Sequence, residues 1–105
     1  MTNSDVSNTG IRVNIKTHEF LREFAYQNRT SIKEAITFII TKLKSEIEEG
    51  KIHFPKYKKV VGEETKNVRI SETDRLFLES LAFHKHTKIK NALEIIASEY
   101  EKRNN

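Results

Sequence analysis

The chain has 105 residues, which is enough for one small domain but would make two independent domains unusually small. Its 19 Lys and Arg residues exceed its 15 Asp and Glu residues, and the net charge of +4 suits a partner with a phosphate backbone without identifying one. The chain contains no cysteine, which excludes disulfides, thiolate zinc sites and thiol nucleophiles.

Several other classes of protein also find no support in the sequence. Residues 1–9 do not have the pattern of a signal peptide, and no apolar segment approaches the roughly 20 residues needed to cross a bilayer. We therefore expect a cytoplasmic protein without membrane contact. His84 and His86 are two residues apart, which places them on different sides of a helix, and we expect no metal and no cofactor. With three glycines and no nucleophile beside a base, we do not expect an enzyme.

The sequence contains an internal repeat. Residues 10–43 align without a gap with residues 67–100 when the chain is shifted by 57 positions, and nine aligned positions are identical. Phe20-Leu21 falls on Phe77-Leu78, for example. The identities fall mainly on positions that helical periodicity assigns to a buried face, so we interpret them as two copies of one folding unit.

The first unit begins with a short strand and continues with two helices. Ile11-Arg12-Val13 alternates between apolar and charged residues, as a strand does, and Asn14 is a good helix N-cap. A helix with one apolar face follows, and residues 27–29 interrupt it. Thr30 or Ser31 is expected to cap a second helix. The apolar positions of the two helices are Phe20, Leu21, Phe24 and Ala25, then Ile32, Ala35, Ile36, Ile39, Ile40, Leu43 and Ile47.

The second unit has the same parts in the same order. Val68-Arg69-Ile70 predicts the strand, and Ser71 predicts an N-cap with Asp74 at the capping-box position. Residues 84–86 interrupt the first helix, and Thr87 is expected to cap the second. The apolar positions are Phe77, Leu78, Leu81 and Ala82, then Ile89, Ala92, Leu93, Ile96, Ala97 and Tyr100.

One such unit could not close a core, because its strand would have two open edges and its helices one covered face each. We therefore expect a mainly α protein in which two strands pair antiparallel over four helices, as a pseudo-dimer within one chain. The expected divisions are an arm over 1–9, units over 10–49 and 66–102, and a basic linker over 50–65. The fifteen residues from Lys51 to Thr65 can span up to about 50 Å, so the return to the second strand is feasible.

This ordered pattern, found twice in phase, resembles the ribbon-helix-helix family of the Arc and MetJ repressors. Two units in one chain are similar to TraY-type conjugation proteins and other two-unit transfer proteins. The resemblance implies that the paired strands enter the major groove of double-stranded DNA, where outward side chains contact the bases. These outward positions are Asn8, Gly10 and Arg12 in the first unit and Thr65, Asn67 and Arg69 in the second.

The resemblance also assigns roles to particular side chains. The two arginines suit guanine and Asn67 suits adenine. Gly10 has no side chain to read a base where Asn67 has one, so we expect the target to be an imperfect inverted repeat. The family also holds a phosphate at the N-terminus of each second helix. Here those positions are Thr30, Ser31 and Lys33, with Thr87, Lys88 and Lys90.

Alternatives remain open at this point. The chain could be an antitoxin-like or assembly module that binds a protein, with an exposed apolar groove. Its second helices could instead read DNA as helix-turn-helix units, through Lys33, Glu34, Thr37 and Lys90. The linker lysines could follow the DNA backbone or simply be solvated. The biological role could be origin recognition with a relaxase partner in conjugation, or transcriptional repression on a plasmid, with or without further copies on adjacent sites.

Overall fold

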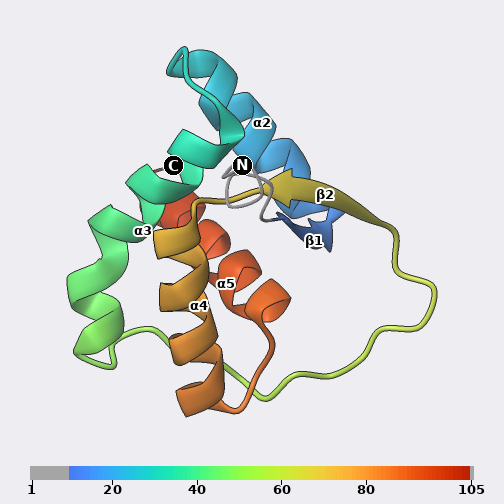
Figure 1. Cartoon of the computed structure of the whole chain (residues 1–105), viewed down its shortest axis with the longest axis vertical. Helices are drawn as coiled ribbons and strands as arrows, with labels where there is room; N and C mark the ends of the chain where they lie inside the picture. Colours follow the sequence, from blue (N-terminus) through green and yellow to red (C-terminus); the bar gives the residue numbers. More distant parts are fainter. Residues whose placement is uncertain (1–9, 105) are drawn as a thin grey trace, which may run out of the picture.

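The computed structural model describes residues 10–104, which form four helices and a two-stranded antiparallel ribbon (Figure 1). The chain is mainly helical, as the sequence predicts. The elements are β1 (Gly10–Asn14), α2 (Ile15–Gln27), α3 (Ile32–Glu48), β2 (Thr65–Arg69), α4 (Glu72–Lys85) and α5 (Ile89–Arg103). Thr65 and Arg103 lie one residue outside the limits expected for the second unit. No helix within these residues is long and apolar enough to cross a membrane.

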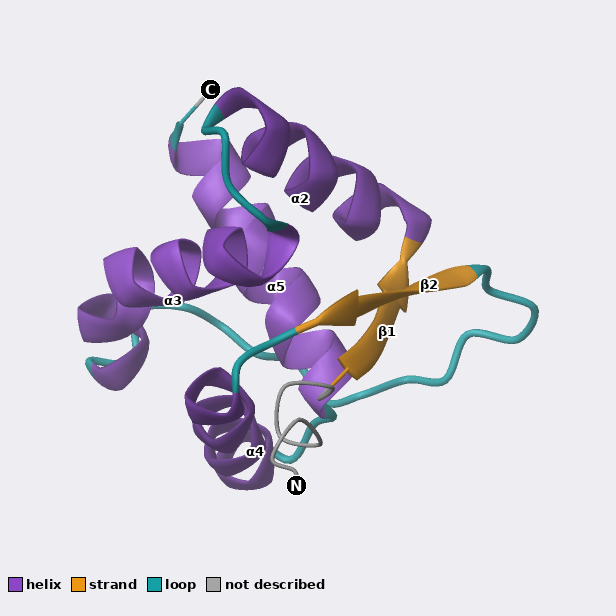
Figure 2. Ribbon diagram, turned by 45° about the horizontal axis from the view of Figure 1, so that its top comes forward, coloured by secondary structure: helices purple, strands orange, loops and turns teal. Residues whose placement is uncertain are grey.

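The ribbon pairs the beginning of one predicted unit with the beginning of the other (Figure 2). Ile11 lies opposite Val68, and on either side of this pair Arg12 faces Asn67 and Gly10 faces Arg69. Alternation along each strand turns Val13 and Val68 into the core, where both are buried. The neighbouring positions therefore form the opposite, outward face.

Each first helix begins where the sequence predicts. The Asn14 side chain accepts a hydrogen bond from the Thr17 amide at 2.8 Å, which caps α2. The Ser71 hydroxyl accepts one from the Asp74 amide at 3.1 Å, which caps α4. These bonds satisfy amides that have no partner inside the helix and fix the angle at which each helix leaves the ribbon.

The second helices differ in how they begin. Ser31 caps α3, and Ser31 and Glu34 form a capping box. The prediction that Thr87 caps α5 is wrong, because the N-cap is Lys88, which makes no side-chain capping bond. The Thr87 hydroxyl instead accepts a hydrogen bond from the Asn91 side chain at 2.7 Å. Position 91, where α3 has its capping-box glutamate, carries an amide in α5, so no box can form there.

The turns between the helices have the same backbone conformation in both halves. Arg29 and His86, which are 57 positions apart, both take a left-handed conformation, with φ of 53° and 57°. At the next residue the Thr30 amide donates to the Ala25 carbonyl, and the Thr87 amide donates to the Ala82 carbonyl, each at 2.9 Å. The spacing of the sequence repeat therefore recurs in the local backbone geometry.

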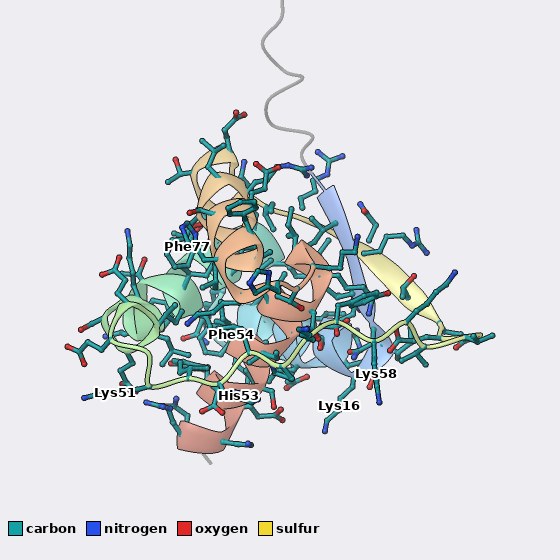
Figure 3. The ribbon with its side chains drawn as sticks, turned by 90° about the horizontal axis from the view of Figure 1, so that it is seen from below. Lys16, Lys51, His53, Phe54, Lys58 and Phe77 are labelled. Carbon is teal, nitrogen blue, oxygen red and sulfur yellow. The ribbon has the colours of Figure 1, made fainter. Side chains whose placement is uncertain are left out.

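A single hydrophobic core joins the two halves. Its largest fully buried side chains come from both strands or their flanks and from all four helices: Val13, Leu21, Ile36, Ile39, Ile70, Leu78, Leu93 and Ile96. Burying one such side chain contributes about 1.5–3 kcal/mol. Ile52 and Phe54 of the linker are also buried in this core, so the linker is partly a structural element. Figure 3 shows Phe54 beneath the helices.

Candidate nucleic-acid interface

The outward face of the ribbon carries the predicted base-contacting side chains. Arg12, Asn67 and Arg69 are exposed there, and Gly10 and Thr65 are half-buried. The structure thus brings five of the six predicted positions onto one surface of two paired strands. Asn8, the sixth, lies outside the described residues. This surface, formed by Gly10, Arg12, Thr65, Asn67 and Arg69, is called the ribbon face below.

The Arg12 guanidinium is held along the ribbon by Thr65. Its Nε donates to the Thr65 hydroxyl at 2.8 Å, and its Nη2 donates to the Thr65 carbonyl at 3.0 Å. A guanidinium has five N–H donors, so these two bonds leave several donors for another acceptor. They also restrict the side chain before any ligand arrives, which reduces the conformational entropy that binding would cost.

Replacing Thr65 by valine tests this restraint. Valine keeps the shape of threonine and removes the hydroxyl that accepts from Arg12 Nε. If the ribbon face binds duplex DNA as the resemblance implies, we expect that binding to weaken about two- to tenfold, because ordering one long side chain costs roughly 0.5–1.5 kcal/mol. Fluorescence anisotropy with a labelled duplex measures this change. The matched variant is Thr41→Val on the exposed side of α3; an equal loss in both variants would contradict the restraint.

Gly10 leaves room for the side chain of Asn67. A Cβ placed on Gly10 would lie 3.0 Å from both the Nδ2 and the Oδ1 atom of Asn67, which is tighter than normal contact. The absence of a side chain at position 10 therefore lets the Asn67 amide lie across the ribbon. The two strands present different chemistry at these equivalent positions.

The N-terminus of α3 is already occupied by a carboxylate of the chain itself. Glu34 accepts hydrogen bonds from the Thr30 hydroxyl and from the Ser31 amide, the latter at 3.4 Å. The hydrogen bonds from Thr30 and Ser31 lower the pKa of the Glu34 carboxyl, so it is ionised at neutral pH. This negative charge sits where the resemblance places a phosphate, and the half-buried Lys33 is next to it.

If the chain binds duplex DNA as the resemblance implies, Glu34→Gln should strengthen that binding. Glutamine can keep the capping box, while the negative charge beside the helix N-terminus is removed. We expect the slope of log affinity against log salt concentration to steepen by roughly one, the effect of one additional phosphate contact. Salt titrations of both proteins measure it. An unchanged slope would place the phosphates away from α3, and Glu48→Gln at the far end of that helix is the control.

Near the N-terminus of α5, the Lys90 side chain is paired with two carboxylates. Lys90 Nζ lies 2.8 Å from a carboxylate oxygen of Glu63 in the linker and 2.8 Å from one of Glu94. Burial lowers the pKa of the Lys90 ammonium, but hydrogen bonds and charge interactions with the two glutamates outweigh it, and the pKa is raised. Lys90 is thus charged and engaged at neutral pH. Of the predicted phosphate contacts here, Lys88 is exposed and Thr87 is half-buried.

Contacts between the two halves position the ribbon over the helices. The Asn14 amide, at the end of β1, donates to the Glu94 carboxylate of α5 at 2.8 Å. At the equivalent place in the other half, the Thr37 hydroxyl of α3 donates to the buried Asp74 carboxylate at the start of α4. The sequence reasoning did not identify these links, because they join residues 80 and 37 positions apart.

The described residues contain no group of three His, Asp or Glu side chains that could hold a metal ion. Comparisons of the chain with models of protein families, with characterised proteins and with solved structures find no significant match.

Proposed function

We propose that the chain is a sequence-specific double-stranded DNA-binding protein that places its ribbon in the major groove. The observation that carries this proposal is the ribbon face itself. Two paired strands turn their apolar residues into the core and present Arg12, Asn67 and Arg69 to solvent. An exposed pair of strands bearing two arginines and an amide has the donors that base edges require.

The dimensions of the ribbon agree with this mode of binding. The major groove of B-DNA is about 12 Å wide, and two paired strands are about 4.8 Å apart, so a ribbon with its side chains fits. A guanidinium can donate to both O6 and N7 of guanine, and an amide can both donate and accept with adenine. The proposed contacts with DNA are noncovalent, so the proposal involves no catalytic residue.

The strand register supports a pseudo-dimer and an imperfect inverted repeat as its target. Ile11 and Val68, equivalent residues of the two units, lie directly opposite each other in the ribbon. A pseudo-twofold axis through this pair would relate the Arg12–Asn67 pair to the Arg69–Gly10 pair. Each half then presents one arginine to the DNA, but the residue opposite it is Asn67 in one half and Gly10 in the other. The two half-sites should therefore differ at the bases that Asn67 contacts.

Contacts in the structure favour reading by the ribbon over reading by the second helices. In the helix-turn-helix alternative, Thr37 and Lys90 would contact bases. Thr37 is bonded to Asp74, and Lys90 is bonded to two glutamates. Both groups would have to leave charged partners before they could contact DNA, whereas Arg12, Asn67 and Arg69 of the ribbon face are exposed.

The biological role that we propose follows from the resemblance to two-unit ribbon-helix-helix proteins. Such a protein would mark a transfer origin for a relaxase, repress a promoter on a plasmid or another mobile element, or do both. Its location on the DNA decides between these roles, and the base contacts are the same in each.

Selection from a library of random duplexes tests the proposal. The full chain is incubated with the library at physiological salt, and bound duplexes are amplified and sequenced over several rounds. We expect enrichment of an imperfect inverted repeat about one turn of DNA or less in length. Enrichment of single half-sites would contradict the pseudo-dimer, and no enrichment would contradict sequence-specific binding.

A further inference from the structure

The linker between α3 and β2 is attached along the first turn of α5. After the buried Phe54, the Pro55 carbonyl accepts a hydrogen bond from the Asn91 side chain at 3.3 Å. The Lys88 ammonium lies 6.0 Å from the centre of the Tyr57 ring, close enough for a cation–π interaction. The Glu63–Lys90 ion pair then holds the end of the linker just before β2 begins.

This path brings the linker beside one end of the ribbon. Lys90, which holds Glu63, also pairs with Glu94, and Glu94 accepts from the Asn14 amide at the end of β1. Asn14 pairs with Thr65, the first residue of β2. In Figure 3, Lys58 lies on the side of the molecule where the strands run, whereas Lys51 lies on the opposite side.

The attached segment is positively charged and not neutralised. Lys56, Lys58 and Lys59 are exposed, and no ion pair within residues 10–104 involves them. Of the two acids that follow, Glu63 is engaged with Lys90, and Glu64 is exposed just before β2. The lysines therefore belong to a segment that is bonded to α5 before them, through the Pro55 carbonyl, and after them, through Glu63.

We propose that Lys56, Lys58 and Lys59 bind the phosphates of the DNA backbone beside the half-site next to the start of β2. This rests on the proposed function, since a ribbon in the major groove brings whatever lies beside it against the phosphates that border the groove. The N-terminus of α3 is occupied by Glu34, and Lys90 of α5 by two glutamates. The linker adds three exposed cations to the exposed Lys88 at the start of α5.

The linker should contact the DNA on one side of the binding site only, because it lies beside the end of the ribbon where β2 begins. It would extend the protected DNA on one flank of the inverted repeat. Lysine contacts to phosphates carry no base information, so they would raise affinity for every duplex by a similar factor.

Localised DNA cleavage tests the position of the linker. Because the chain has no cysteine, Lys58→Cys creates a single attachment point for an iron chelate that cleaves nearby DNA. On the selected duplex we expect cuts on one flank only. The matched variant is Lys51→Cys, on the opposite side of the molecule, which should give no localised cuts. Absence of cuts from position 58, or equal cuts on both flanks, would overturn the proposal.

Neutralising variants test whether the charges bind. Changing the three linker lysines to glutamine should reduce the magnitude of the salt slope by about 2–3, with the preference among duplexes unchanged. A control triple variant removes the same charge from the C-terminal parts of α3 and α5 and from the residue beyond Gly50: Lys42→Gln, Lys51→Gln and Lys102→Gln.

The two triple variants separate the failure of the inference from that of the proposed function. If the linker variant keeps the slope of the unmodified chain, or changes it no more than the control does, the linker proposal is wrong while duplex binding stands. If the unmodified chain binds no duplex, the proposed function fails, and the linker proposal with it.

Discussion

Replacing Arg12 or Arg69 by alanine should weaken binding to the selected duplex by about 1–3 kcal/mol for each arginine. Binding to unrelated duplexes should weaken much less, because it depends on phosphate contacts rather than on base edges. The reason lies in the ribbon face, where both guanidinium groups are carried by exposed positions of paired strands. Anisotropy titrations with the selected duplex and a scrambled one, at one salt concentration, measure both effects.

Arg22→Ala is the matched control for these substitutions. It removes one positive charge from an exposed position of α2, away from the ribbon face. The control should lower affinity for both duplexes equally, and only slightly. If Arg12→Ala and Arg69→Ala cost no more than Arg22→Ala on the selected duplex, the ribbon does not read the bases.

Replacing Leu21 or Leu78 by alanine should destabilise the whole chain by about 2–5 kcal/mol. Both side chains are fully buried in the core that joins the two halves, and each substitution would remove apolar contacts and leave a cavity. Since one core serves both units, each variant should unfold in a single transition. Urea titration followed by circular dichroism, with the midpoint and slope fitted, measures the change.

An exposed leucine gives the control for the stability measurement. Leu76 lies two positions from Leu78 on α4 with 57% of its surface exposed, so Leu76→Ala should change the free energy of unfolding by less than about 0.5 kcal/mol. Two separate transitions in the Leu21 or Leu78 variant would mean that the units fold independently, and the proposed pseudo-dimer would be contradicted.

Much of the fold could be predicted from the sequence because its signals are local or repeated. Alternation at Ile11-Arg12-Val13 and the caps Asn14 and Ser71 are properties of a few neighbouring residues, and the structure confirms them. The predicted cap at Thr87 is wrong because Thr87 aligns with Thr30, whereas the N-caps are Ser31 and its counterpart Lys88, whose side chain has no acceptor for a capping bond. The repeat is therefore a good guide to the core and a poorer one to the polar helix ends.

The electrostatics of the candidate interface could not be predicted in the same way. The Arg12–Thr65 bonds cross 53 positions of the chain, and they depend on the strand register. The resemblance implies that Lys90 contacts a phosphate, but the path of the linker brings Glu63 to it. Pairing of this kind depends on tertiary contacts, and no local pattern in the sequence reports it.

The central claim is that the ribbon face contacts DNA, and amide NMR spectra recorded while the selected duplex is added test it most directly. The account predicts that the largest shifts occur at the amides of β1 and β2 and in the linker segment 55–63 beside them. The amides at the C-terminal ends of α3 and α5 should change little. Large shifts along the exposed side of α3, with an unchanged ribbon, would contradict the account.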